Sequence, residues 1–373
     1  MHATHDPVTV GFISLGCAKN LVDTEHMAAV LRRDGVGLAR SPDEADILLI
    51  NTCGFIGEAR QESIDVILRA CARKAAGRHR AIIVAGCMAQ RYGRKLARSM
   101  PEVDAFIGID ALDRIGDTIR GILGGRARRC DTRPHAARIF DPPAGRPVFT
   151  GGPFAYLKIA DGCNHRCAFC AIPAIRGRFR SRSIAAIVRE ADDLLTRGIR
   201  ELNLVAQDVT AFGRERTGRN ELPKLLRALG GLGGRFWIRI LYGYPDAVTD
   251  DLLDTMGEMR MICRYLDVPV QHSHPDMLRA MRRAGTIRPV SELARRIRTR
   301  LPGTTLRTTC ITGFPGEGKT QFNHLRDYLR GAAFDHLGVF VYSAEEGTPA
   351  AGMPHGVSAA TARRRRGILM RDQ

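Results

Sequence analysis

The sequence contains neither a membrane-spanning segment nor an export signal. No run of about 18 apolar residues occurs, and the first residues, MHATHDPVTV, lack the charged and then apolar pattern of a signal peptide. We therefore expect a cytoplasmic protein that does not bind membranes. Disulfides are rare in that compartment, so the ten cysteines of the chain indicate metal binding or catalysis.

Motifs of nucleic-acid-binding domains are also missing. The sequence has no aromatic motif of the RNA-recognition type and no zinc-finger spacing. Its net charge is nevertheless +18, and almost all of the basic residues are arginine. Two explanations stay open: a polyanionic partner such as nucleic acid or a ribosome, or a GC-rich genome that favours arginine, alanine and glycine.

The chain is long enough for two or three domains. At 373 residues it exceeds one ordinary domain. In residues 8–125, strand-like apolar runs alternate with helical periodicity, which predicts a parallel sheet; the runs are 8–16, 45–51, 81–86 and 104–108. Residues 126–153 are rich in Arg, Pro and Gly and predict a linker.

A second series of strand-like and helical segments fills residues 154–373. Strands are predicted at 154–160, 201–206, 236–242, 265–270, 305–312 and 336–343. Six units are too few for a closed eight-unit barrel, so we expect an open, partial TIM-type barrel with its active face at the carboxyl ends of the strands. The predicted fold class is α/β: a flavodoxin-like parallel-sheet domain over 1–125, then this partial barrel.

Three cysteines stand close together in DGCNHRCAFCAIP, residues 161–173. Cys163, Cys167 and Cys170 have gaps of three and two residues between them. A structural zinc ion takes four ligands, usually from two CxxC-like pairs, and no second pair lies nearby. Three thiolates instead suit a cluster of four irons, one of which is left without a protein ligand. A zinc loop in a non-catalytic RNA- or ribosome-binding protein is the alternative.

The CxxxCxxC spacing resembles the signature of the radical S-adenosylmethionine enzymes. Phe169, directly before the last cysteine, matches the aromatic residue that family members usually carry beside the adenine. The resemblance implies that the open iron chelates the methionine part of S-adenosylmethionine. An electron from the cluster then splits the sulfonium and gives a 5′-deoxyadenosyl radical.

A second set of cysteines follows the predicted strands of the N-terminal domain. Cys17, Cys53 and Cys87 come after three successive strands. Because parallel strands end at the same edge of a sheet, these thiols can meet although they are far apart in the sequence. We predict a second cluster with three cysteine ligands. The remaining cysteines are expected to be structural; they are Cys71, Cys130, Cys263 and Cys310.

Together the two cysteine sets resemble the methylthiotransferases, which add a methylthio group to an unactivated C–H bond. The resemblance covers essentially the whole chain, including the stretches SLGCAKNLVDTEHM, DGCNHRCAFCAIPAIRGRFRSR and VYSAEEGTPA. Family members that modify tRNA adenosine usually have Cys-Gln-Met-Asn at the first cysteine. Cys17-Ala18-Lys19-Asn20 instead resembles the RimO branch, which modifies the β-carbon of an aspartate in protein twelve of the small ribosomal subunit. The tRNA-modifying branch remains the alternative.

The resemblance also implies cofactors and partners. It implies two [4Fe-4S] clusters and S-adenosylmethionine, a small ribosomal subunit as partner, and an electron donor such as flavodoxin or ferredoxin. We expect a monomer. Family members continue beyond the barrel into a small β-barrel called TRAM, and we expect none within these 373 residues.

Polar residues near the ends of the predicted barrel strands are candidates for contacts to the cofactor. We predict that Lys158, Arg180, Gln207 and Gln271 bind S-adenosylmethionine together with Phe169. Asp208 and His272 are the neighbouring polar residues at two of these strand ends.

One motif points to a different chemistry. Residues 313–320, GFPGEGKT, match the phosphate-loop pattern GxxxxGK[ST], which would indicate an ATPase. Too little chain follows Thr320 for the rest of such a domain, and no acidic strand motif for magnesium is evident. We therefore interpret the match as accidental.

Overall fold

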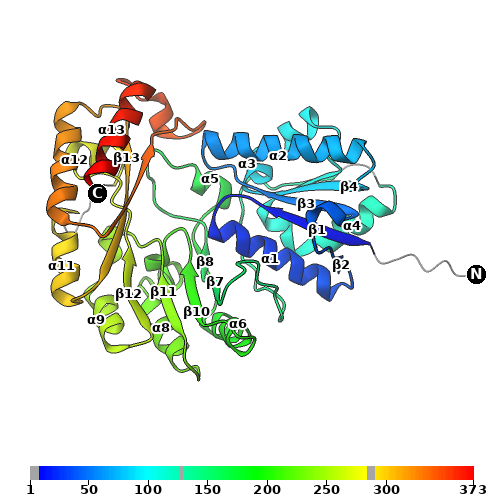
Figure 1. Cartoon of the computed structure of the whole chain (residues 1–373), viewed down its shortest axis with the longest axis horizontal. Coiled ribbons are helices and arrows are strands. Elements are labelled where there is room, and N and C mark those ends of the chain that lie inside the picture. The colour runs from blue at the N-terminus through cyan, green and yellow to red at the C-terminus, as the bar shows by residue number, and fades with distance from the viewer. Residues whose placement is uncertain (1–7, 127–128, 284–289) are drawn as a thin grey trace, which may run out of the picture. The chain divides into compact units, whose positions relative to one another are not determined.

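A computed structural model of the chain describes residues 8–126, 129–283 and 290–373. The contacts divide it into two compact units. The first consists of Met1–Gly152 and Ala174–Arg178, and the second of Pro153–Pro173 and Phe179–Gln373. Figure 1 labels most of the helices and strands of both.

The first unit is built on a six-stranded parallel sheet with the order β2-β1-β3-β4-β5-β6. The strands are β1 Thr9–Ser14, β2 Gly37–Leu38, β3 Ile47–Thr52, β4 Ala81–Gly86, β5 Ala105–Ile107 and β6 Arg129–Asp131. The helices are α1 Ala18–Arg33, α2 Gly57–Ala75, α3 Cys87–Ser99 and α4 Ile115–Leu123. This order reverses between β1 and β3, as in flavodoxin-like sheets, where ligands bind at the carboxyl ends beside that reversal. The predicted parallel sheet is confirmed.

Both faces of this sheet are buried, as the continuous apolar strands predict. Ile47 and Leu49 of β3 join one core, with α1 and α4, whereas Leu48 and Ile50 join the other, with α2 and α3. This alternation follows from the two-residue period of a strand. The strands are thereby held rigidly, and their carboxyl ends present the loops that follow them.

The region predicted as a linker contains a strand. Arg129–Asp131 form β6, which pairs in parallel with β5, Phe106 opposite Cys130. A three-residue edge strand is fixed by its pairing partner rather than by its own sequence, so periodicity did not reveal it.

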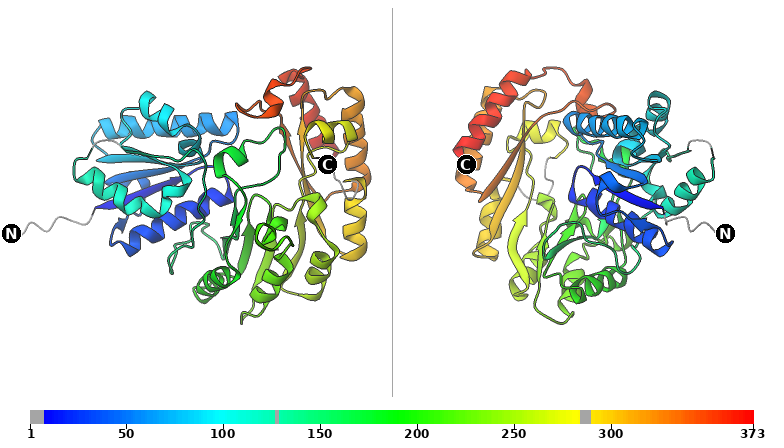
Figure 2. Two further views of the ribbon diagram at one scale, coloured as in Figure 1. Left: turned by 180° about the vertical axis from the view of Figure 1, so that it is seen from behind. Right: turned by 45° about the vertical axis from the view of Figure 1, so that its right-hand side comes forward.

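The second unit contains six parallel strands in the order β14-β13-β12-β11-β10-β7. They are β7 Phe154–Lys158, β10 Glu201–Val205, β11 Trp237–Ile240, β12 Ile262–Asp267, β13 Thr305–Thr312 and β14 His336–Val341. The connecting helices are α6 Ile184–Thr196, α7 Arg214–Thr217, α8 Leu222–Gly230, α9 Asp250–Glu258, α10 Pro275–Ala280, α11 Leu293–Arg300, α12 Lys319–Ala332 and α13 Ala359–Asp372. Figure 2 shows the strands as a curved, open sheet. The predicted partial barrel is confirmed.

Two small elements frame the cysteine loop of this unit. β8 Ala160–Asp161 and β9 Arg180–Ser181 form a two-stranded antiparallel ribbon. The short helix α5, Ile172–Arg176, follows the loop. Its last residues belong to the first unit, which includes Ala174–Arg178.

Candidate functional site

The first unit brings its three predicted cluster cysteines to one edge of the sheet. Cys17 follows β1 and precedes α1, Cys53 follows β3, and Cys87 begins α3 directly after β4. These three strands are neighbours, and their carboxyl ends include the reversal point at which such sheets bind ligands.

The loops that carry these cysteines approach one another closely. A Cβ atom on Gly16 would lie 2.8 Å from the Cβ atom of Cys53, and one on Gly54 would lie 3.0 Å from the carbonyl carbon of Cys87. Gly16 also has a φ of 89°, which other residues rarely adopt. Glycine is therefore required here for the three thiols to gather.

The three thiols lie in different electrostatic surroundings. Burial raises the pKa of Cys87 to about 12, although the nearby charge of Arg176 opposes this. At Cys17, loss of hydration favours the neutral thiol, but the charges of Lys19 and Arg176 outweigh it and lower the pKa. Cys87 is buried. Metal binding would displace the protons that remain on these thiols.

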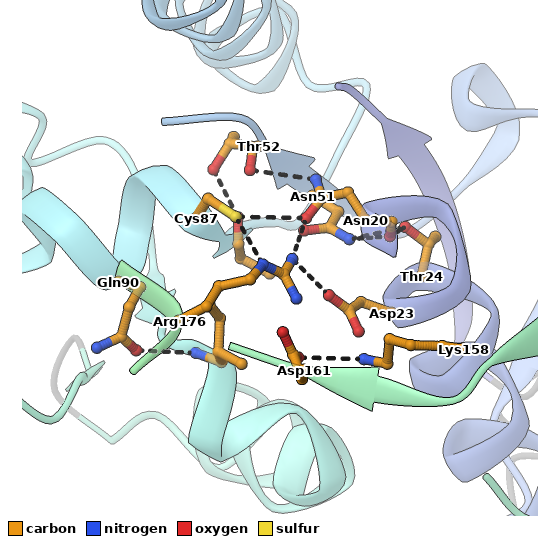
Figure 3. Close-up of polar contacts among 12 residues, drawn as sticks. Asn20, Asp23, Thr24, Asn51, Thr52, Cys87, Gln90, Lys158, Asp161 and Arg176 are labelled. Atoms are coloured by element: carbon orange, nitrogen blue, oxygen red, sulfur yellow. Dashed lines mark hydrogen bonds and ion pairs between the residues drawn. The ribbon is translucent and has the colours of Figure 1, made fainter. Parts of the chain in front are cut away.

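Arg176 is a buried residue of this site that the sequence analysis did not identify. Its Nε donates to Cys87 Sγ at 3.3 Å, and its Nη2 donates to Asn20 Oδ1 at 3.1 Å and to Asp23 Oδ2 at 2.8 Å. Figure 3 shows the guanidinium between these side chains. Both partners of the Arg176–Asp23 ion pair are only 1% exposed.

This arrangement suits an anionic iron–sulfur cluster. Three thiolates supply the ligands, and a guanidinium offers a charge and N–H donors to sulfur, which are groups that tune such clusters. Asn20 adds rigidity, because its Nδ2 donates to the carbonyls of Leu15 and Thr52 and so joins two of the loops. The predicted set Cys17, Cys53 and Cys87 therefore fits the cluster.

The second unit holds its three cysteines in the loop between β8 and α5. Burial raises the pKa of Cys163 and of Cys170 to about 12, and the charge of Cys167 contributes to both shifts. Arg283 donates from Nη1 to Cys167 Sγ at 3.5 Å. Each cysteine set thus has one arginine on one sulfur, and three close thiols again fit a cluster of four irons.

Backbone hydrogen bonds hold this loop in place. Ala168 donates its N–H to the carbonyl of Met281 and accepts from the N–H of Ala350, while Cys170 N donates to the carbonyl of Cys167. Phe169 packs on the apolar cluster that contains Ala168 and its neighbours. These hydrogen bonds connect the loop to two other segments of the barrel.

His165, which lies between the first two cysteines of the loop, has partners of its own. Its Nε2 is 2.7 Å from Asp208 Oδ2, and its ring stacks on Tyr244 with centroids 3.8 Å apart. The guanidinium of Arg283 lies over the ring of Tyr244, 4.5 Å from the ring centroid. His165 thereby ties the loop to the ends of β10 and β11.

The other predicted cofactor residues differ in whether their side chains already bond to other residues of the chain. Lys158 forms an ion pair with Asp161 at 3.4 Å, and Arg180 lies in β9. Both polar atoms of the Gln207 amide are buried and have no hydrogen-bond partner among the described residues. A buried amide without partners is costly, so Gln207 is the polar side chain best prepared for a ligand.

Gln271 is held in an unusual backbone conformation. Its φ is 68°. Its N–H donates to the carbonyl of Thr309, and its carbonyl accepts from the N–H of Ile311, both in β13. Tyr242, at the end of the neighbouring strand β11, has a φ of 64°. Backbone strain of this kind is frequent at functional sites. Here the two strained residues follow the carboxyl ends of β11 and β12.

No single-ion site is evident in the part of the chain that the structure describes. There, no three histidine, cysteine, aspartate or glutamate side chains converge closely enough to hold one metal ion. In a four-iron cluster each thiolate binds a different iron. The six ligand cysteines and the five cofactor residues stay predictions.

The phosphate-loop-like segment 313–320 is folded around its own carboxylate. Glu317, which is fully buried, accepts from Gly313 N at 3.1 Å and from Arg365 Nη1 at 2.5 Å. Lys319 is exposed at the start of α12. The Glu317 carboxylate therefore occupies the backbone N–H of Gly313, a donor of the kind that binds phosphate in a phosphate loop.

We expect Lys319→Ala to leave thermal stability unchanged and Arg365→Ala to lower it. Without Arg365 the Glu317 carboxylate is buried unpaired, which costs about 3–5 kcal/mol. Arg364→Ala, an exposed neighbour in α13, is the matched control, and unfolding curves give the comparison. Binding of magnesium ATP tighter than roughly 10 μM would contradict this view of the loop.

Comparisons with known proteins agree with the two units. Residues 9–108 match the model of the family described as "Uncharacterized protein family UPF0004", and residues 157–329 match the radical SAM superfamily. None of the helices in the described ranges is long and apolar enough to cross a membrane.

Solved structures share the fold. TsrM from Kitasatospora setae, a radical S-adenosylmethionine methyltransferase with cobalamin and a [4Fe-4S] cluster bound, has a TM-score of 0.65 at 14% identity. The match covers 92% of this chain and 77% of TsrM. The cobalamin-dependent enzyme OxsB has a TM-score of 0.60 at 12% identity, over 93% of this chain and 55% of its own.

Relatives of known family are much more similar in sequence. The ribosomal protein uS12 methylthiotransferase RimO of Syntrophus aciditrophicus is 48% identical over 98% of this chain and 81% of its own length. The RimO protein of Geobacter sulfurreducens is 44% identical over the same shares. The chain belongs to the RimO family of radical S-adenosylmethionine methylthiotransferases.

Proposed function

We propose that this protein methylthiolates uS12, protein twelve of the small ribosomal subunit, at the β-carbon of an aspartate. The observation that carries the proposal is the pair of cysteine triads, each at the carboxyl ends of a parallel sheet and each with an arginine on one sulfur. Two relatives whose alignments cover 98% of the chain are named ribosomal protein uS12 methylthiotransferase RimO.

Two [4Fe-4S] clusters and S-adenosylmethionine are the proposed cofactors. Bound in the barrel, a cluster and S-adenosylmethionine supply one-electron chemistry that can activate an inert C–H bond. We assign Cys163, Cys167 and Cys170 to the barrel cluster, and Cys17, Cys53 and Cys87 to the second one. Each triad would leave one of four irons without a cysteine ligand.

Residues of the barrel are proposed to bind and orient S-adenosylmethionine. Gln207 provides an amide that has no hydrogen-bond partner among the described residues, and Phe169 provides an aromatic face beside the last cysteine. Lys158, Arg180 and Gln271 complete the proposed contacts to S-adenosylmethionine. His165 and Asp208 hold the loop in shape, so that reacting groups meet in a fixed geometry.

Arg176 is the proposed positioning residue of the second cluster. It is held by Asp23 and Asn20 and donates to Cys87. A fixed cation beside the sulfur stabilises added negative charge. Flavodoxin or ferredoxin is the proposed electron donor, the cytoplasm the proposed location and a monomer the proposed state.

The test is an anaerobic reaction with S-adenosylmethionine, sulfide, a reductant and assembled small subunits. We expect the intact mass of uS12 to increase by one methylthio group in place of one hydrogen, with the change on an aspartate. Bulk tRNA treated in parallel should stay unmodified. A methylthio group on tRNA adenosine with unchanged uS12 would move the chain to the neighbouring branch.

A further inference from the structure

A pocket of about 440 Å³ opens at the amino ends of three barrel strands. Its lining includes Glu201 and Trp237, the first residues of β10 and β11, and Ile262, the first residue of β12. The predicted cofactor residues Gln207 and Gln271 follow the opposite, carboxyl ends of β10 and β12. Active sites of such barrels lie at the carboxyl ends, so this pocket is separate from the cluster site.

The lining is positively charged. Glu201 is its one carboxylate, and it is neutralised by Arg239, whose Nε and Nη2 donate to it at 2.7 and 3.4 Å. Arg264 donates to the carbonyl of Pro302 at 2.6 Å, which orients the guanidinium without neutralising it. Arg260 has no acidic partner in the described part of the chain. Two uncompensated guanidinium groups therefore flank the pocket.

Trp237 places an aromatic face beside these cations. It is the only tryptophan of the chain, and it is 59% exposed. Tryptophan is among the most apolar side chains by area and is enriched at binding surfaces. Met256 and Met259 supply further apolar lining.

We propose that this pocket binds a nucleotide of single-stranded RNA, with the base stacked on Trp237 and the phosphate held by Arg260 and Arg264. Aromatic stacking combined with guanidinium contacts to phosphate is how proteins bind single strands. The pocket volume lies in the range of small-molecule sites. The choice of RNA over an acidic peptide rests on the proposed function, which brings the chain to ribosomal RNA, and agrees with the net charge of +18.

The single tryptophan makes a direct test available. The anaerobically purified full chain is titrated with a single-stranded RNA oligonucleotide of about ten nucleotides, without S-adenosylmethionine or reductant. Emission of Trp237 and the anisotropy of a label on the RNA are followed together. We expect both signals to change with the same midpoint, because the fluorophore lies in the binding site.

Two variants locate the site. Trp237→Ala should weaken RNA binding about 10-fold, since one base loses its stacking partner. Arg260→Glu should weaken it about 10-fold at low salt and reduce the dependence of affinity on salt by about one phosphate contact. Arg295→Glu in α11 is the control, because it makes the same change in net charge on an exposed arginine outside the pocket. It should alter affinity less than about 2-fold.

A competition experiment distinguishes RNA from an acidic peptide as the ligand of the pocket. Polyglutamate of matched charge should not displace the RNA; equal binding of polyglutamate, or RNA binding without a change in Trp237 emission, would overturn the proposal. Activity is read separately. Loss of RNA binding in Arg260→Glu with unchanged methylthiolation of isolated uS12 supports the pocket, whereas absent methylthiolation with intact RNA binding counts against the proposed function alone.

Discussion

Replacing Cys163, Cys167 and Cys170 together with alanine is expected to abolish formation of 5′-deoxyadenosine from S-adenosylmethionine. The variant should also lose about half of the iron of the anaerobically purified chain, because one of two four-iron clusters is without ligands. The barrel loop is anchored through the backbone N–H and carbonyl of Ala168, which bond to Met281 and Ala350. The fold should therefore survive the substitutions, and loss of the product will report on chemistry.

The complementary variant replaces Cys17, Cys53 and Cys87. It should lose the other half of the iron, about four per chain, while it still cleaves S-adenosylmethionine and transfers no methylthio group. The matched control replaces three half-buried or exposed cysteines outside both sets: Cys71, Cys130 and Cys263. The control should keep all of its iron. Full iron content after loss of Cys17, Cys53 and Cys87 would refute the second cluster.

Replacing Arg176 with leucine is expected to have the second-largest effect. The change breaks the buried ion pair between Arg176 and Asp23, and breaking such a pair from one side costs about 3–5 kcal/mol of unfolding free energy. It also removes the donor to Cys87 Sγ. Without this cation, the reduced and more negative state of the second cluster is less stable, so its midpoint potential should become more negative.

Two further variants separate these roles. In Arg176→Leu combined with Asp23→Leu, both partners of the buried ion pair are replaced by apolar side chains, so most of the lost stability should return while the potential stays shifted. Arg178→Ala, an exposed neighbour in the same segment, is the control. Unfolding curves and redox titrations followed by electron paramagnetic resonance provide the readouts. An unchanged potential in the double variant would leave Arg176 with a packing role only.

The sequence predicted that Cys17, Cys53 and Cys87 lie at one edge of a sheet, because parallel topology gathers strand ends. Cys17, Cys53 and Cys87 are 36 and 34 residues apart, yet each follows one of three adjacent parallel strands. The alternating segments imply that sheet, and the sheet places the cysteines at one edge. Local patterns were sufficient for this part of the site.

Arg176 could not be predicted in the same way. It is six residues beyond Cys170 in the sequence, but its side chain lies against Cys87, Asn20 and Asp23 of the first unit. Nothing local distinguishes it from Arg178 or Arg180, since all three stand in one arginine-rich stretch. Such long-range pairing is decided by tertiary packing. The one useful signal is that a buried acid in α1, Asp23, requires a partner.

The structure also explains why a motif can mislead. The GFPGEGKT segment has the glycines and lysine of a phosphate loop, but Glu317 turns inward and pairs with Arg365, which lies 48 residues later. The pattern describes residue types and cannot show that an internal carboxylate already accepts a backbone N–H of the loop.

The most direct measurement of the central proposal follows one hydrogen atom. Small subunits that carry deuterium on the β-carbon of aspartate are incubated with the reduced chain, sulfide and S-adenosylmethionine, and the 5′-deoxyadenosine and uS12 are analysed by mass spectrometry. We expect one deuterium in 5′-deoxyadenosine and a methylthio group on an aspartate of uS12. Deuterium-free 5′-deoxyadenosine together with unmodified uS12 would contradict the proposal.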